Sequence, residues 1–201
     1  MEELLDGRLS RAARSRAAIC DACLDLLQEG VLRPSADQLA DRAGLSRRSI
    51  FYHFKDLAEL YDAVVEAGLQ RCAPLLEEVS AELPLELRIR QLVERRCSFF
   101  EATSPFTWAL TAQSLGGEAS EQARRVSRSA LESQRADVER LFGDQLQGRS
   151  RGERGELIEA LASAANAPTW EYLRRTRGLS IPRARGVVGR TLKALLGAGA
   201  G

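Results

Sequence analysis

The chain has 201 residues, enough for one or two domains with a sizeable hydrophobic core. Hydrophobic residues make up 44% and charged residues 28% of it, which is ordinary for a globular protein. No apolar run approaches the roughly 18 residues that a membrane span requires, and the acidic start MEELLDG lacks the apolar core of a secretory signal. We therefore expect a soluble, cytoplasmic protein without a membrane partner.

Positive charge is concentrated in two parts of the chain, although the formal net charge is only +1. Residues 7–55 hold nine Lys and Arg against five acids, a local excess of four. From Arg174 onward, seven basic residues stand against no acid. Local positive charge suits binding to a polyanion, although solvated helix surfaces and helix C-termini also account for it.

Helical periodicity dominates the chain and strand alternation is almost absent, so we predict an all-α fold. The first helix is expected over about Ser10–Gln28. Cys20-x-x-Cys23 lies on its apolar stripe, and Cys72 and Cys97 fall on other predicted helices without a second such motif. Free cysteine is usually a small buried hydrophobe, so we expect no metal site and no cofactor.

Two short helices are predicted next, joined by a tight turn. Ser35-x-x-Gln38 is typical of a capping box at the start of the second helix. Gly44 suits the left-handed residue after that helix ends. Ser46 is expected to cap a third helix over residues 47–54.

The fourth helix is expected to be long. Asp56-x-x-Glu59 is predicted to cap it, and its apolar stripe follows the 3.6-residue period closely. Pro74 is expected to kink or shorten its far end. A division between two domains is predicted along this helix, near residue 60.

Five further helices are expected after Pro84, over residues 85–102, 105–115, 118–142, 156–175 and 183–196. Ser104-Pro105 is predicted to separate the first two, because proline has no amide hydrogen and disfavours the helical conformation of the preceding residue. The Gly- and Arg-rich stretch 148–155 is interpreted as a loop, and Pro168 is expected to perturb the helix that contains it.

The third helix has two chemically different faces. At about 100° per residue, Ile50 and Phe54 point together toward the first helix, while Arg48, Tyr52 and Lys55 lie on the opposite side. Two short helices around a Gly turn, the second exposing Arg, Ser and Tyr, make a helix-turn-helix. Such a helix fits the major groove of DNA, where arginine donates twice to a guanine edge. The arginines of the first helix (Arg11, Arg14 and Arg16) would neutralise flanking phosphates.

The segment LADRAGLSRRSIFYHFKDLAELYDAVVE resembles the tetracycline-repressor (TetR) type of bacterial regulator over about residues 10–66. Leu39-Ala40, Ala43-Gly44-Leu45-Ser46, Ser49 and Phe54 match the family pattern position by position. Arg48 stands where a small residue is usual, and Phe51 where Tyr is common. By the resemblance, the expected DNA-contacting residues are Ser35, Arg47, Arg48, Ser49, Phe51, Tyr52, His53 and Lys55. For His53 and Phe51, a structural role in packing is an open alternative to a DNA contact.

The resemblance further implies that the remaining helices bind an effector and form a homodimer. The residues expected to line an effector pocket are Phe99, Phe100, Phe106, Trp108, Thr111 and Gln113, with Asn166 and Trp170. An equally weighted alternative is that these side chains fill an ordinary hydrophobic core. The residues expected to form the dimer interface are Leu157, Ile158, Leu161, Ala165, Val188, Leu192 and Leu195. The alternative is that these apolar helix faces are buried inside one subunit.

The sequence thus predicts an N-terminal three-helix DNA-binding domain over 8–60, with the helix-turn-helix at about 36–54, and a helical effector-binding and dimerisation domain over 61–201. The predicted function is a ligand-responsive transcriptional regulator, a repressor that binds double-stranded DNA at a palindromic operator as a homodimer. An enzyme is not expected, because the single His lies on the DNA-reading helix and no nucleophile elbow is present. The alternative is a helical membrane-surface or partner-binding protein that uses the basic C-terminal segment.

Overall fold

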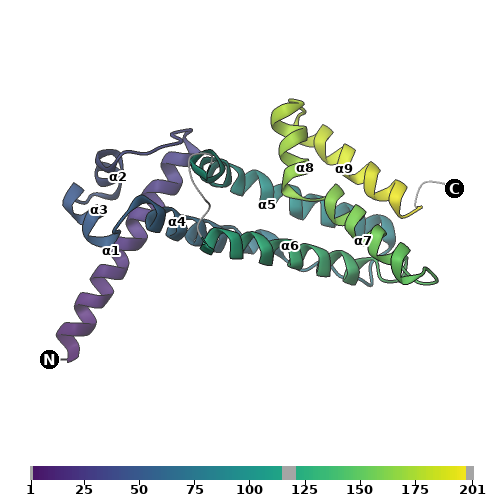
Figure 1. Ribbon diagram of the computed structural model, residues 1–201, viewed down its shortest axis with the longest axis horizontal. Helices are drawn as coiled ribbons and strands as arrows, with labels where there is room; N and C mark the ends of the chain where they lie inside the picture. The colour runs from purple at the N-terminus through teal and green to yellow at the C-terminus, as the bar shows by residue number, and fades with distance from the viewer. Residues whose placement is uncertain (1, 115–120, 198–201) are drawn as a thin grey trace. The chain divides into compact units, whose positions relative to one another are not determined.

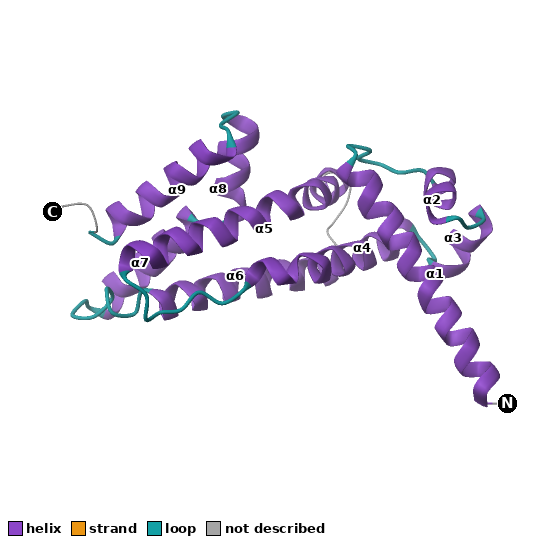
Figure 2. Ribbon diagram, turned by 180° about the vertical axis from the view of Figure 1, so that it is seen from behind, coloured by secondary structure: helices purple, strands orange, loops and turns teal. Residues whose placement is uncertain are grey.

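The computed structural model describes residues 2–114 and 121–197, and in these ranges every regular element is a helix (Figure 2). The predicted all-α fold is therefore confirmed. By its internal contacts the chain forms two compact units: Met1–Cys72 with Thr103–Arg124, and Ala73–Ala102 with Arg125–Gly201. None of the described helices is both long and apolar enough to cross a membrane.

The first unit is built on α1 (Glu2–Gln28), against which α2 (Ala36–Ala43), α3 (Arg47–His53) and α4 (Leu57–Cys72) pack (Figure 1). The helix α1 begins eight residues earlier than the expected Ser10. Pro74 follows the end of α4 within a short 3₁₀ helix, η1 (Ala73–Leu76). The core of this unit holds the stripe Ile19, Cys20, Cys23, Leu24 and Leu27 of α1.

The second unit contains most of α5 (Leu85–Ser114) and α6 (Glu121–Leu141), with α7 (Arg151–Ala164), α8 (Ala167–Glu171), the π-helix η2 (Tyr172–Thr176) and α9 (Ile181–Leu195). One continuous core joins these helices, and its largest fully buried side chains are Trp170, Phe142, Ile89, Leu92, Leu141 and Leu146. Two arginines of α5 are buried beside it. Arg88 forms a bidentate ion pair with Asp144 (2.7 and 2.8 Å), and Arg96 donates to the carbonyls of Gln134 and Ala165.

The predicted break at Ser104-Pro105 is wrong, because α5 runs unbroken from Leu85 to Ser114 with Pro105 inside it. Proline removes one backbone hydrogen bond and costs about 3 kcal/mol in a helix interior. The helix continues because both sides of the proline are packed: Phe100 is 5% and Phe106 1% exposed. The hydroxyl of Thr107 also donates to the carbonyls of Thr103 and Ser104, just before the proline.

Two further boundaries differ from the prediction. The stretch 148–155 is not all loop, because Ser150 and Glu153 form a complete capping box that starts α7 at Arg151. The expected helix 156–175 is two helices. The helix α7 ends at Ala164, and the side chain of Asn166 accepts the amide of Thr169 (2.9 Å) to begin α8. Proline at the start of a helix is well tolerated because its missing amide would be unpaired there.

Candidate nucleic-acid interface

Local hydrogen bonds start α2 and α3 and form the turn between them, as predicted. The hydroxyl of Ser35 accepts the amide of Gln38 (3.2 Å) while the Gln38 side chain accepts the amide of Ser35 (2.9 Å), which completes the capping box. Gly44 has φ 65°, a left-handed conformation that a side chain disfavours. The hydroxyl of Ser46 then accepts the amide of Ser49 (3.2 Å) and starts α3. The left-handed Gly44 and the Ser46 cap thus define where α2 ends and α3 begins.

The predicted two faces of α3 are present. Ile50 is 3% and Phe54 2% exposed, so both anchor the helix in the core of the first unit. On the other side, Arg48 and Lys55 are exposed, and Tyr52 is 82% exposed. A large aromatic side chain this exposed contributes no hydrophobic stabilisation to its own subunit. The exposed face of α3 is therefore free to contact a partner.

A clamp holds the C-terminal end of α3 to α1, and Arg16 forms it. Its guanidinium donates to the carbonyl of His53 (2.7 Å) and to the Glu59 carboxylate (3.1 Å), and it lies 4.2 Å from the centroid of the Phe54 ring. Arg16 is thus engaged within the unit, and its role as a phosphate contact stays a prediction. Sequence reasoning missed the clamp because its partners are 37 and 43 residues away.

The start of α4 is capped as Asp56-x-x-Glu59 predicts. The amide of Glu59 donates to Asp56 (2.8 Å), and the Glu59 carboxylate accepts the amide of Lys55 (3.1 Å). This backbone hydrogen bond from Lys55, followed by the one from Arg16, holds the pKa of Glu59 below its usual value. The Glu59 carboxylate is therefore ionised at neutral pH and links the middle of α1 to the end of α3 and the start of α4.

The eight predicted DNA-contacting residues all belong to the first unit, and seven of them lie on or directly after α3. Arg47 is exposed but pairs with Asp37 of α2 (3.2 Å). Phe51 is 57% exposed beside the Arg47 guanidinium, so it is not a core residue. His53 is half-buried with its ring edge-on to Tyr52. Ser35 and Ser49 are engaged in the caps described above.

The candidate pocket residues do not gather in one described cavity. Phe106 packs in the first unit, where its ring lies against Gly68 of α4. Phe100, Asn166 and Trp170 instead line a space in the second unit that has no room for a water molecule. Phe99 is half-buried against the core. The indole of Trp170 donates to Glu101 (2.8 Å), which also pairs with Arg174. The side chains of Trp108, Thr111 and Gln113 fall outside the described part of the chain.

The candidate dimer residues face inward. Five of the seven (Ile158, Leu161, Ala165, Val188 and Leu192) are at most 3% exposed in the core of the second unit. Leu157 and Leu195 are partly buried against the same core. On α9 the large apolar residue that remains exposed is Val187, at 42%. The apolar stripes of α7 and α9 therefore hold one subunit together in this structure.

The basic C-terminal segment is tied to acids of its own unit at three positions: Arg174 pairs with Glu101, Arg175 with Glu171, and Lys193 with Glu86. The four cysteines are free and buried. Burial raises the pKa of Cys20 to about 11 and that of Cys23 and Cys97 to about 12, so these thiols are protonated at neutral pH. Among the described residues, no group of three or more His, Cys, Asp or Glu side chains could hold a metal ion.

Comparison with known proteins points to one family. Residues 19–64 match the family model described as bacterial regulatory proteins, tetR family. Over 74 residues the chain is 34% identical to the HTH-type transcriptional regulator AcrR of Shigella flexneri. That alignment covers 36% of this chain and 34% of AcrR, so the chain matches about a third of its curated relative.

The whole fold also has a counterpart among solved structures. A tetR-family transcriptional regulator from Streptomyces coelicolor superposes with a TM-score of 0.65, over 92% of this chain and 82% of the other. The two sequences are 19% identical, so this likeness concerns the fold.

Proposed function

Because the chain belongs to the TetR family of bacterial regulatory proteins, we propose that it is a transcriptional regulator that binds double-stranded DNA through α3. The observation that carries the proposal is the division of α3 into an anchored and an exposed face. Ile50 and Phe54 are buried, while Arg48 and Tyr52 point to solvent. A helix held in this way enters the major groove with its polar side toward the base edges.

The proposed roles of the exposed residues follow from their chemistry. Arg48 has no ion-pair partner in the described part of the chain, so its guanidinium is available for a base edge. Tyr52 offers a hydroxyl and a ring on the same face. Lys55 is exposed beside Asp56, at 4.0 Å, and suits a phosphate. Arg14, whose only hydrogen bond among the described residues is to the carbonyl of Ser10, suits a phosphate of the flanking backbone.

The proposal extends to a homodimer that reads a palindromic operator, in which two copies of α3 lie about 34–36 Å apart. Since most of the apolar residues of α7 and α9 are buried in the subunit core, the contacts would come from the exposed flanks of these helices. Val187 on α9 is the candidate to test. Val187→Glu should place a charge in the interface and convert the dimer to a monomer in sedimentation analysis, whereas an unchanged dimer would exclude this flank.

We further propose that the regulator represses transcription and that a small effector releases it from DNA. An effector shifts the balance between two states only if it binds them with unequal affinity. An added effector should therefore weaken operator binding by the same factor by which operator DNA weakens effector binding. Tighter operator binding in the presence of every bound ligand would contradict this role.

Selection of bound sites from random DNA tests the function as a whole. The expected result is a two-fold symmetric sequence bound well above the background of random DNA. Arg48→Ala should then relax the preference at one base of each half-site, at a cost of about 1–3 kcal/mol. Arg14→Ala should weaken binding to every sequence and lower the slope of affinity against salt. Failure to select any sequence, with equal affinity of both variants for random DNA, would refute the proposal.

A further inference from the structure

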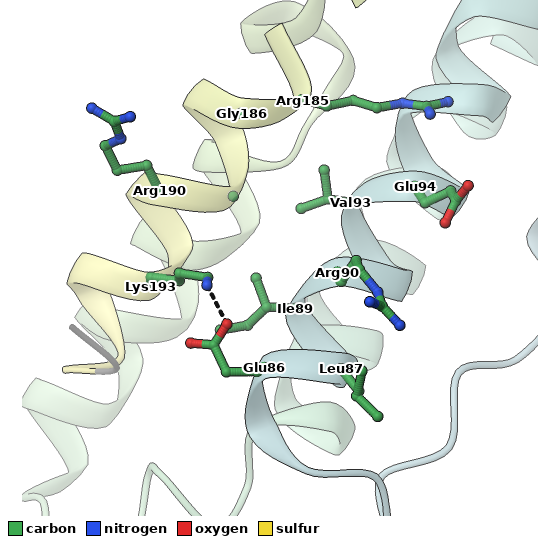
Figure 3. A pocket seen from close by; sticks show the side chains of 11 residues that line it. Glu86, Leu87, Ile89, Arg90, Val93, Glu94, Arg185, Gly186, Arg190 and Lys193 are labelled. Atoms are coloured by element: carbon green, nitrogen blue, oxygen red, sulfur yellow. Dashed lines mark hydrogen bonds and ion pairs between the residues drawn. The ribbon is translucent and has the colours of Figure 1, made fainter. Parts of the chain in front are cut away.

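A groove runs between α5 and α9 on the second unit (Figure 3). Its volume is about 600 Å³, within the range of about 300–1,000 Å³ that small-molecule sites occupy. Ile89 and Val93 point from α5 toward α9 and form part of its floor, as Figure 3 shows. The space beside Trp170 has no room for a water molecule, so the groove is the larger of these two candidate sites in this unit.

Two glycines of α9 open the groove. Gly186 and Gly189 both line it, and a Cβ atom built at either position would meet nothing within 4 Å. Since glycine in a helix is about 0.8–1.0 kcal/mol less favourable than alanine, α9 gives up helix stability at each position. The backbone of α9 consequently forms one wall, and larger side chains at these positions would fill the space.

The walls carry more positive than negative charge. Four cations (Arg90, Arg185, Arg190 and Lys193) and two acids (Glu86 and Glu94) line the groove, which leaves an excess of two. Lys193 pairs with Glu86 at one end, whereas the other three cations form no ion pair in the part of the chain that the structure describes. These three contrast with Arg88 and Arg96 of the same unit, which pair with acids.

Arg185 closes the opposite end. Its guanidinium reaches across to α5 and donates to the Ser98 hydroxyl (2.9 Å). The Nε atom of Arg185 is buried without a hydrogen-bond partner among the described residues. A buried donor without an acceptor is costly, and an anionic oxygen would satisfy it with a charge-assisted hydrogen bond.

We propose that this groove binds a small organic anion with an apolar body. Its acidic group would lie at the Arg185 end, and its apolar part would run along Gly186, Gly189 and the aliphatic floor toward Lys193. A cationic end and an aliphatic floor favour such a molecule over a neutral or cationic one of the same shape. The inference goes beyond DNA binding and does not depend on it.

The test uses the full chain and decanoate as the probe, measured by equilibrium dialysis without DNA. The expected result is one decanoate per chain, with decyltrimethylammonium, of the same chain length and opposite charge, bound at least tenfold more weakly. Arg185→Gln should weaken decanoate binding about tenfold or more, as expected for the loss of a charge-assisted hydrogen bond. Gly189→Leu should abolish binding by filling the groove.

Matched controls exclude general effects. Gly152→Leu places the same side chain at an exposed α7 glycine with equally open surroundings, and Arg151→Gln removes an exposed arginine next to it. Both should bind decanoate like the wild type, and melting curves should show that all four variants fold. The proposal would be overturned if the Arg185→Gln and Gly189→Leu variants bound decanoate as tightly as the wild type does. It would also be overturned if the wild type did not bind decanoate.

A second copy of the chain is the rival occupant. If Gly189→Leu weakens self-association in sedimentation analysis while the wild type binds no decanoate, the groove is a contact between subunits and the proposal is wrong. Operator selection is a separate measurement, so failure of the ligand site and failure of the DNA-binding proposal are distinguishable.

Discussion

Replacing Arg16 by glutamine should destabilise the first unit and loosen α3. The hydrogen bond from a charged donor to the carbonyl of His53 is worth about 1.5–3 kcal/mol, and the cation–π contact with Phe54 about 0.5–1 kcal/mol. The Arg16 side chain is 40% exposed, so the lower ends of these ranges apply. The ion pair with Glu59 adds little, because that carboxylate is solvated. We expect a loss of about 2 kcal/mol in the free energy of unfolding.

Urea unfolding followed by circular dichroism measures this loss, and hydrogen exchange of the α3 amides shows where it arises. Arg14→Gln is the matched control, since the only hydrogen bond of Arg14 among the described residues is to the carbonyl of Ser10, at 3.3 Å. A surface substitution of this kind usually changes stability by less than about 0.5 kcal/mol. If the free energies of unfolding of the Arg16→Gln and Arg14→Gln variants differed by less than about 0.5 kcal/mol, the clamp would be refuted.

DNA binding by the same two variants separates the clamp from a phosphate contact. A residue that neutralises one phosphate lowers the slope of log affinity against log salt by about one when it is removed. Arg14→Gln should show this change in slope. Arg16→Gln should instead weaken binding through the loosened α3, with the slope unchanged. A reduced slope without loss of stability in Arg16→Gln would instead support the phosphate role that the sequence predicts.

Two other substitutions test the packing and the ion pairs. Gly68→Ala should cost about 1–3 kcal/mol of stability, because the added Cβ would lie 2.8 Å from the buried Phe106 ring, whereas Gly152→Ala, in open space, should be neutral or stabilising in the same urea titration. Arg88 lowers the pKa of Asp144 to about 2, so the stability from this pair is complete above the ordinary carboxyl pKa of about 4 and is lost as pH falls toward 2. Asp144→Asn should lower stability at pH 7 and flatten the decline between pH 4 and 2, and an unchanged decline would contradict the pair's role.

Signals confined to a few consecutive residues predicted the structure well. Ser35-x-x-Gln38, Gly44 and Ser46 each act through hydrogen bonds or dihedral angles within four residues, so no distant part of the chain can override them cheaply. The same rule would have found the start of α7. Ser150-x-x-Glu153 is a capping box, but the neighbouring glycines made the segment resemble a loop. Here a specific pairing of two side chains outweighs a compositional impression.

Pro105 shows the opposite case, in which distant contacts override a local signal. The proline predicts a break, and its local cost is real. Packing of Phe100 and Phe106 on either side of it outweighs that cost, and their partners belong to other helices. The pattern of residues around the proline carries no information about those partners. For the same reason an apolar stripe predicts that a helix is buried but not whether its own subunit or a second copy buries it, which is why Val188 and Leu192 fitted both interpretations.

The arginines of the first unit show why counting charges overestimates a DNA-binding surface. Residues 7–55 have a local excess of four positive charges, yet Arg16, Arg42 and Arg47 are engaged by Glu59, Glu29 and Asp37. What separates Arg48 from these three is its position opposite the buried Ile50 and Phe54 on a seven-residue helix, together with the lack of an acid partner within the described residues. The wheel of α3 identifies this position because the apolar Ile50 and Phe54 mark the side that is buried. The sequence of α1 gives no such assignment, so only the fold distinguishes Arg16, which donates to the carbonyl of His53, from Arg14, which donates to the carbonyl of Ser10.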